Sequence, residues 1–131
     1  MTGAAVERSF EIAAERAGDI TPLVYQRLFA LHPDMEALFV RDTTGAVRGE
    51  MLARLIDAMF DFLGSNHYAT NFVGTEIVTH EGYGVPRDVF PKFIEATAAT
   101  VQDICADAWT AEMETGWRDL TRGLIEPALA R

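Results

Sequence analysis

The stretch Ile77-Val78-Thr79-His80-Glu81-Gly82-Tyr83-Gly84-Val85-Pro86 decides how this sequence is interpreted. An apolar segment from Phe72 to Val78 leads into His80, and two glycines and a proline then end any helix. One imidazole surrounded by hydrocarbon is what a haem requires, since the iron takes a nitrogen ligand and the ring takes apolar contacts. A solvated histidine near a helix end would have the same local sequence. The rest of the chain has to decide between these two interpretations.

Length and charge narrow the classes of function. We expect residues 1–131 to form one domain, and the formal charge of −9, from 20 acidic and 11 basic side chains, disfavours binding to nucleic acid or to anionic membranes. No segment approaches the roughly 18 apolar residues of a membrane span, and the first residues do not resemble a secretory signal. These features predict a soluble cytoplasmic protein. The single cysteine, Cys105, excludes an internal disulfide, and its apolar neighbours predict a small buried side chain.

Apolar residues recur at spacings of three and four almost throughout, which predicts an all-α fold. The second helix is expected to bury Ile20, Leu23, Val24, Leu28 and Leu31. We expect a first helix over 5–17 and a second one that is capped by Asp19 or Thr21 and ends near His32-Pro33. A helical turn over 33–39 and a loop over 41–49 should follow, and then a helix from about Ala46 to Leu63. The last three expected helices are the one that carries His80, a long one opened by Pro86 and one capped by Asp107.

Three motifs in this order resemble the globin family, in particular bacterial single-domain globins and the haem domains of flavohaemoglobins. The first is Tyr25-Gln26-Arg27-Leu28-Phe29, followed by His32-Pro33-Asp34-Met35 and Leu38-Phe39. The second is His80 with Tyr83-Gly84-Val85 and Phe90, and the third is Trp117 in the last helix. The resemblance runs from about Ile20 to Leu124 and implies a globin-like fold of about six helices that sandwich a haem.

The resemblance also implies roles for individual residues. His80 would be the proximal ligand of the iron, Phe39 would press on the porphyrin, and Tyr25 would be the distal hydrogen-bond donor. Counting back from His80 places Arg48 at the usual distal position and Leu52 over the ring, whereas counting forward from Phe39 puts Gly49 at the distal position. The expected haem cage comprises Phe39, Arg48, Met51, Leu52, Ile77, Val78, Tyr83, Val85, Phe90 and Phe93.

The sequence departs from the family pattern on both sides of the expected ring. No histidine or glutamine lies between Val47 and Leu52, so a distal-histidine contact is not expected. Phe90 stands where flavohaemoglobins carry a tyrosine that supports the proximal histidine, and Glu126 is the one candidate for their glutamate. Without such a carboxylate, the second nitrogen of His80 should donate to a backbone carbonyl one turn earlier.

The resemblance implies haem b and a diatomic gas ligand, namely dioxygen, carbon monoxide or nitric oxide, and therefore oxygen binding or transport. Conversion of nitric oxide to nitrate is a second expectation. It would need a separate reductase, because no flavin or nicotinamide domain follows the last helix. The alternatives are a haem-free or sensor-type globin-fold interaction module and a plain helical bundle that binds a partner.

Overall fold

In the computed structural model, which describes residues 2–130, all regular secondary structure is helical and no strand is present. The all-α prediction is therefore confirmed. The elements are α1 (Thr2–Ala17), α2 (Thr21–Leu31), the 3-10 helix η1 (Pro33–Phe39), α3 (Ala46–Leu63), α4 (Ala69–Gly82), α5 (Val89–Cys105), the short 3-10 helix η2 (Ala106–Ala108) and α6 (Ala111–Leu129).

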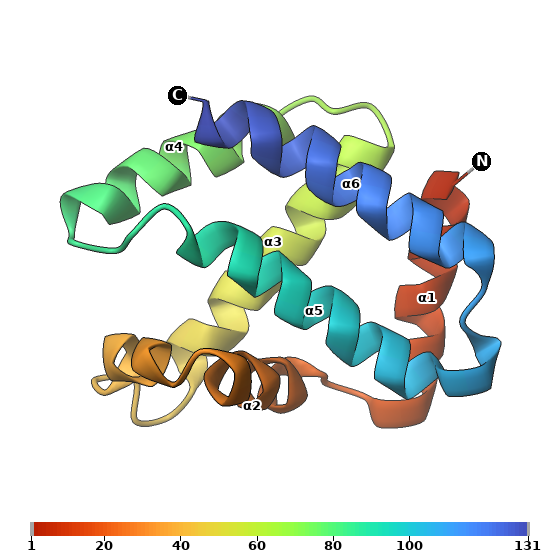
Figure 1. The fold of residues 1–131 in the computed structure, drawn as a ribbon, viewed down its shortest axis with the longest axis horizontal. Helices are drawn as coiled ribbons and strands as arrows, with labels where there is room; N and C mark the ends of the chain where they lie inside the picture. Colours follow the sequence, from red (N-terminus) through yellow and green to blue (C-terminus); the bar gives the residue numbers. More distant parts are fainter. Residues whose placement is uncertain (1, 131) are drawn as a thin grey trace.

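The helices cross one another around one core (Figure 1). Helix α6 packs on α4 and α1, and α5 packs on α1 and α2, while α3 contacts α4 behind them. Helix α4 is attached to the rest of the fold through α6 and α3. As a result the end of α4, which carries His80, faces the start of α5 across the turn that joins them.

Several predicted boundaries agree closely with the structure, and three do not. One of the three is the cap of α2, since Ile20, and neither Asp19 nor Thr21, is its N-cap residue. The turn over 33–39, the helix over 46–63 and the end of α2 at His32 lie where the sequence places them. Helix α5 begins at Val89 rather than Pro86, because residues 87 and 88 form a turn after the proline. Asp107 does not cap α6, since Thr110 has the extended N-cap conformation and its hydroxyl accepts the backbone N–H of Met113 at 3.1 Å.

The predicted inner face of α2 is only partly correct. Val24 and Leu28 are buried, but Leu23 and Leu31 are 40% and 56% exposed. Tyr25 is buried in their place, with 3% of its surface exposed. Helix α2 packs mainly on α5 and η1, so its buried face is rotated away from the stripe that apolar residues alone suggest.

A buried hydrogen-bond chain joins α6 to α1. The indole Nε1 of Trp117 donates to the Ser9 hydroxyl at 3.0 Å, and that hydroxyl donates to the Val6 carbonyl at 2.6 Å. Ser9 and Trp117 are both buried, so this chain satisfies polar atoms that would otherwise destabilise the core. Cys105 is buried beside it, as predicted, and burial raises the pKa of its thiol.

Asp61, near the end of α3, connects this helix to the start of α4 by hydrogen bonds. Its carboxylate accepts the backbone N–H groups of His67 at 3.2 Å, Tyr68 at 2.9 Å and Ala69 at 2.8 Å. Burial alone would raise the pKa of Asp61, but these backbone hydrogen bonds outweigh burial and lower the pKa below its ordinary value. The charged carboxylate also lies at the positive end of the α4 dipole.

We expect Asp61→Ala to lower the stability of the protein at pH 7, because three backbone donors lose their acceptor. A carboxyl whose pKa is depressed in the folded state stabilises that state above the unfolded pKa. The difference between variant and parent should therefore shrink as the pH falls below about 3.9. Urea denaturation at several pH values measures it. Asp57→Ala, at an exposed position one turn earlier on α3, is the control, and an equal loss in both variants would contradict the prediction.

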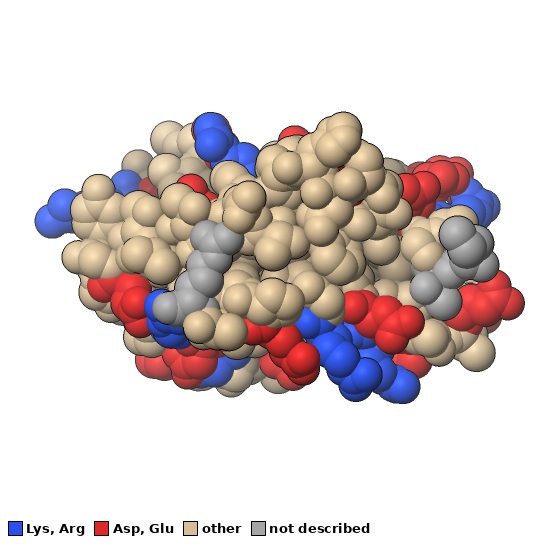
Figure 2. All heavy atoms as spheres, turned by 90° about the horizontal axis from the view of Figure 1, so that it is seen from above, with Lys and Arg blue, Asp and Glu red and all other residues tan. Residues whose placement is uncertain are grey.

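The charged side chains are unevenly distributed over the surface. Figure 2 shows one face on which acidic and basic residues lie mainly around the rim, with a broad uncharged centre. Two of the large apolar side chains exposed on α4 and just before it are Tyr68 and Val78, which are 45% and 49% exposed. Across residues 2–130, no helix combines the length and the apolar character that crossing a membrane requires.

Candidate functional site, an apolar crevice beside His80

A crevice of about 490 Å³ opens between η1, the loop before α3, the end of α4 and the start of α5. Its volume falls within the range of about 300–1,000 Å³ that is usual for small-molecule and cofactor sites. Most of its lining is apolar, and the polar contribution comes from the loop over 41–44 and from His80. The predicted iron ligand His80 and five residues of the predicted haem cage line it together, namely Phe39, Met51, Val85, Phe90 and Phe93.

His80 lies in the last turn of α4, with 29% of its side chain exposed. Its Nδ1 lies 2.7 Å from the carbonyl oxygen of Glu76, one turn earlier in the helix. The sequence predicts this contact, because a helix carbonyl is the nearest acceptor when no other partner is present. A neutral imidazole that donates from Nδ1 leaves the lone pair on Nε2 for a ligand or metal. The ring of Phe90 meets the imidazole edge-on at 5.4 Å and restricts its rotation.

The carboxylate of Glu76 also lies beside His80, and the sequence did not lead us to predict it. One carboxylate oxygen of Glu76 lies 3.5 Å from Nδ1 of His80, so Glu76 offers the imidazole both its backbone and its side chain. The i, i+4 spacing of Glu76 and His80 on one helix would have been enough to find it. The two residues also line a smaller apolar hollow of about 80 Å³ that adjoins Phe93 and Met51.

Tyr25 lies at the base of an aromatic cluster next to the crevice. Its ring centroid is 5.3 Å from that of Phe39 and 5.4 Å from that of Phe93, both of which line the crevice, and Phe29 completes the cluster. The phenol donates to the backbone carbonyl of Arg48 at 3.1 Å. Burial raises the pKa of Tyr25 well above its ordinary range, so the hydroxyl stays protonated and remains a donor.

Asp42 and Arg48 shape the entrance between the loop and α3. The Asp42 carboxylate accepts the backbone N–H groups of Val47 and Arg48 at 3.1 and 2.9 Å, which fixes the start of the helix. Burial favours a higher pKa for Asp42, but these bonds and the Arg48 guanidinium lower it. The guanidinium lies over the rings of Phe29 and Phe39 at 5.7 Å, and its buried Nε makes no hydrogen bond within the described residues.

The corner that follows His80 is held from two sides. Arg87 donates from Nε to the Glu81 carboxylate at 2.8 Å and from Nη1 to the Leu129 carbonyl at 2.9 Å. The first of these bonds lowers the pKa of Glu81. The positive φ of 88° at Gly84 lets the chain reverse direction between them. This corner brings Val85 and Val89 to the wall of the crevice.

Other predicted cage residues lie elsewhere. Leu52 is buried on the opposite side of α3, against a groove shared with α1, and Ile77 is fully buried in the core. Val78 is 49% exposed and Tyr83 is 84% exposed, and neither lines the crevice. Of the two α3 residues Met51 and Leu52 predicted for the cage, only Met51 lines the crevice, together with Ala46 and Val47 at the start of α3. Glu126 is exposed on α6 and forms none of the contacts described for His80.

The donor set suits a haem. Residues 2–130 contain no cluster of three histidine, cysteine, aspartate or glutamate side chains that could hold a bare metal ion. A single imidazole in an apolar crevice is compatible with a haem, which needs one nitrogen ligand for its iron and apolar contacts for its ring. Arg48 does not line the crevice; its Nε makes no hydrogen bond within the described residues but lies 3.8 Å from the Asp42 carboxylate, so the guanidinium already has an acidic partner.

Compared with known proteins, the chain matches no family model, no curated protein and no solved structure. The function therefore has to be argued from the residues and their geometry.

Proposed function

We propose that this chain is a globin-like haem b protein that binds a diatomic gas at an iron held by His80. The observation that carries the proposal is the position of His80 in the wall of an apolar crevice, with Nδ1 occupied by the Glu76 carbonyl and Nε2 left for the metal. When bound, the haem would supply an iron with an open site for dioxygen, carbon monoxide or nitric oxide.

The residues around the crevice have distinct roles in this proposal. Phe39, Phe90 and Phe93 exclude water from the ring, which slows oxidation of the iron. Arg48 could pair with a propionate only in competition with Asp42, whose carboxylate lies 3.8 Å from its Nε, and with the Phe39 carbonyl, which accepts from its Nη2 at 3.4 Å. Tyr25 is buried behind Phe39 and Phe93 and does not line the crevice, so in this proposal its hydroxyl would give up the bond to the Arg48 carbonyl when it donates to a bound gas.

Oxidation of nitric oxide to nitrate is a further part of the proposal, based on the resemblance to flavohaemoglobin haem domains. Each turnover combines one dioxygen with one nitric oxide and leaves the iron short of one electron. A separate reductase must return that electron. Nitrate yield per haem, measured with a supplied reductant, tests this part, and a yield of one equivalent would reject repeated turnover.

A haem-free globin-like interaction module is the second candidate, and one observation favours it. The Tyr25 hydroxyl already has a partner in the Arg48 carbonyl, and the rings of Tyr25, Phe29, Phe39 and Phe93 pack directly on one another. The protein therefore satisfies its distal polar group without any ligand.

Absorption spectroscopy separates these two candidates. The proposal predicts that purified protein titrated with haem develops a strong Soret band at one equivalent. It also predicts that carbon monoxide shifts the band of the reduced form, since the sixth position on the iron is open. A titration with no saturable band would reject the haem proposal and favour the interaction module.

A further inference from the structure

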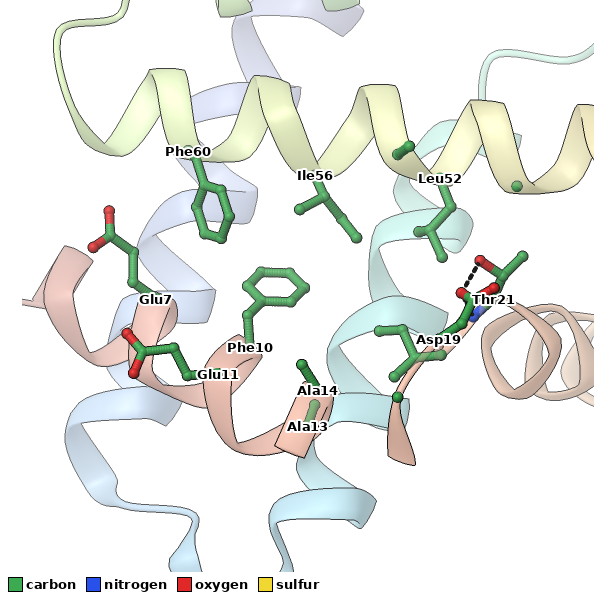
Figure 3. A pocket seen from close by; sticks show the side chains of 14 residues that line it. Glu7, Phe10, Glu11, Ala13, Ala14, Asp19, Thr21, Leu52, Ile56 and Phe60 are labelled. Atoms are coloured by element: carbon green, nitrogen blue, oxygen red, sulfur yellow. Dashed lines mark hydrogen bonds between the residues drawn. The ribbon is translucent and has the colours of Figure 1, made fainter. Parts of the chain in front are cut away.

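A second hollow lies on the far side of α3 from the crevice. It has a volume of about 890 Å³ and runs between α1 and α3, where it is closed at one end by the turn over 18–21. Helix α1 packs mainly on α5 and α6 and meets α3 through the edge-on contact of the Phe10 ring with the Phe60 ring at 5.4 Å, and the groove opens beside this contact. Figure 3 shows Leu52, Ile56 and Phe60 in a row along α3, with Ile56 and Phe60 pointing toward Phe10 of α1 and Leu52 pointing toward the turn that carries Asp19 and Thr21.

The length of the groove and the residues that line it are suited to binding a helix. From Gly49 to Phe60 it follows α3 for roughly 16 Å at 1.5 Å per residue, which matches about eleven residues of a guest helix. Its walls include Ala13, Ala14 and Ala53, whose small side chains allow a guest backbone to approach closely. Phe60 is 37% exposed and offers an aromatic contact.

The charges around the groove specify the occupant. Every charged residue that lines it is acidic, namely Glu7, Glu11 and Asp19, and Asp57 is exposed on α3 one turn after Ala53. Arg8 pairs with Glu11 at 3.0 Å, whereas Glu7 and Asp57 form no ion pair within residues 2–130. A second copy of this chain, at a net charge of −9, would bring like charges together, and anionic lipid would be repelled in the same way.

We propose that the groove between α1 and α3 binds an amphipathic helix of a partner protein, with leucine-like side chains on one face and lysine or arginine on the other. The apolar face would cover Ile56 and the exposed part of Phe60, whose other side packs on the buried Phe10, and the basic side chains would meet Glu7 of α1 and Asp57 of α3. This inference is independent of haem binding, because the groove and the crevice lie on different sides of α3 and share no lining residue.

The test uses a synthetic helical peptide of leucine and lysine, labelled with fluorescein, and fluorescence anisotropy. Ala53→Trp fills the exposed wall of the groove without changing charge, and we expect it to weaken binding about tenfold or more. Ala111→Trp, at an exposed position on α6, is the matched control and should bind as the parent does. Glu7→Gln combined with Asp57→Asn should weaken binding about three- to tenfold at low salt, and Glu112→Gln with Asp119→Asn should not.

NMR chemical-shift mapping identifies the binding surface directly. Shifts that cluster on α1 and α3 would support the proposal. Equal binding by Ala53→Trp and the parent, with shifts spread over other acidic surfaces, would overturn it in favour of non-specific attraction by charge. Concentration-dependent dimerisation of the parent that Ala53→Trp abolishes would also overturn it, since the occupant would then be a second copy. Haem titration of the same variants should be unchanged, which keeps this test separate from that of the proposed function.

Discussion

Replacing His80 with alanine is expected to abolish stable haem binding. Mutating a residue that only hydrogen-bonds to a metal ligand lowers metal affinity by about 10- to 100-fold. Loss of the ligand itself should therefore weaken haem binding by more than about 100-fold. The variant keeps the helix, because His80 is near the end of α4 and its Nδ1 contact is with the same helix. The measurement is the Soret absorbance after haem addition and gel filtration.

His67→Ala is the matched control, since His67 is exposed before α4 and does not line the crevice. Its spectrum should equal that of the parent. In His80→Gly, added free imidazole should restore the band, because it refills the position of the missing side chain. A full Soret band in His80→Ala at one equivalent of haem would show that another group holds the iron, and the proposed site would be wrong.

Replacing Tyr25 with phenylalanine is expected to speed the release of bound dioxygen by about tenfold to a hundredfold. Hydrogen bonds to charged or strongly polarised acceptors are worth about 1.5–3 kcal/mol, and phenylalanine keeps the ring that packs on Phe39 and Phe93. Stopped-flow measurement of the dissociation rate tests this. Since burial raises the pKa of Tyr25, its hydroxyl remains protonated, and the rate in the parent should stay constant from pH 7 to about pH 10.

Tyr68→Phe, at a position 45% exposed, is the control and should leave the dissociation rate unchanged. The Tyr25→Phe variant should also lose about 1 kcal/mol of stability, because the hydrogen bond to the Arg48 carbonyl disappears. A stability loss with no change in dioxygen release would mean that Tyr25 supports only the structure. The distal role proposed for its hydroxyl would then be rejected.

Local features of the chain were enough to locate the helices. The segment Ala46–Leu63 is helical as predicted, since its apolar residues recur with helical period between Gly45 and Gly64. The short helix over Pro33–Phe39 begins at a proline, as its sequence indicates. The cap of α6 was misassigned because Asp107 and Thr110 are both good capping residues, and only the backbone conformation of Thr110 selects it.

The contact between His80 and the Glu76 carbonyl was also predictable, because both residues belong to one helix and their separation is fixed by its geometry. The Glu76 carboxylate follows from the same geometry, although the sequence analysis overlooked it. In contrast, the side of α3 that faces the crevice depends on how α3 is rotated against its neighbours. Met51 and Leu52 lie about 100° apart around the helix axis, and the packing of α3 turns Met51 toward the crevice and Leu52 toward the groove with α1.

By itself, the sequence determined the helical class, most helix limits and the contact that orients His80, since these depend on periodicity and on residues within one or two turns. Only the tertiary structure decided which side chains gather at the crevice. Tyr25, Phe39 and Phe93 come from three elements that are far apart in the chain, and their contacts depend on packing angles. The groove between α1 and α3 has the same origin, because it depends on α1 packing mainly on α5 and α6 while it meets α3 through Phe10 and Phe60.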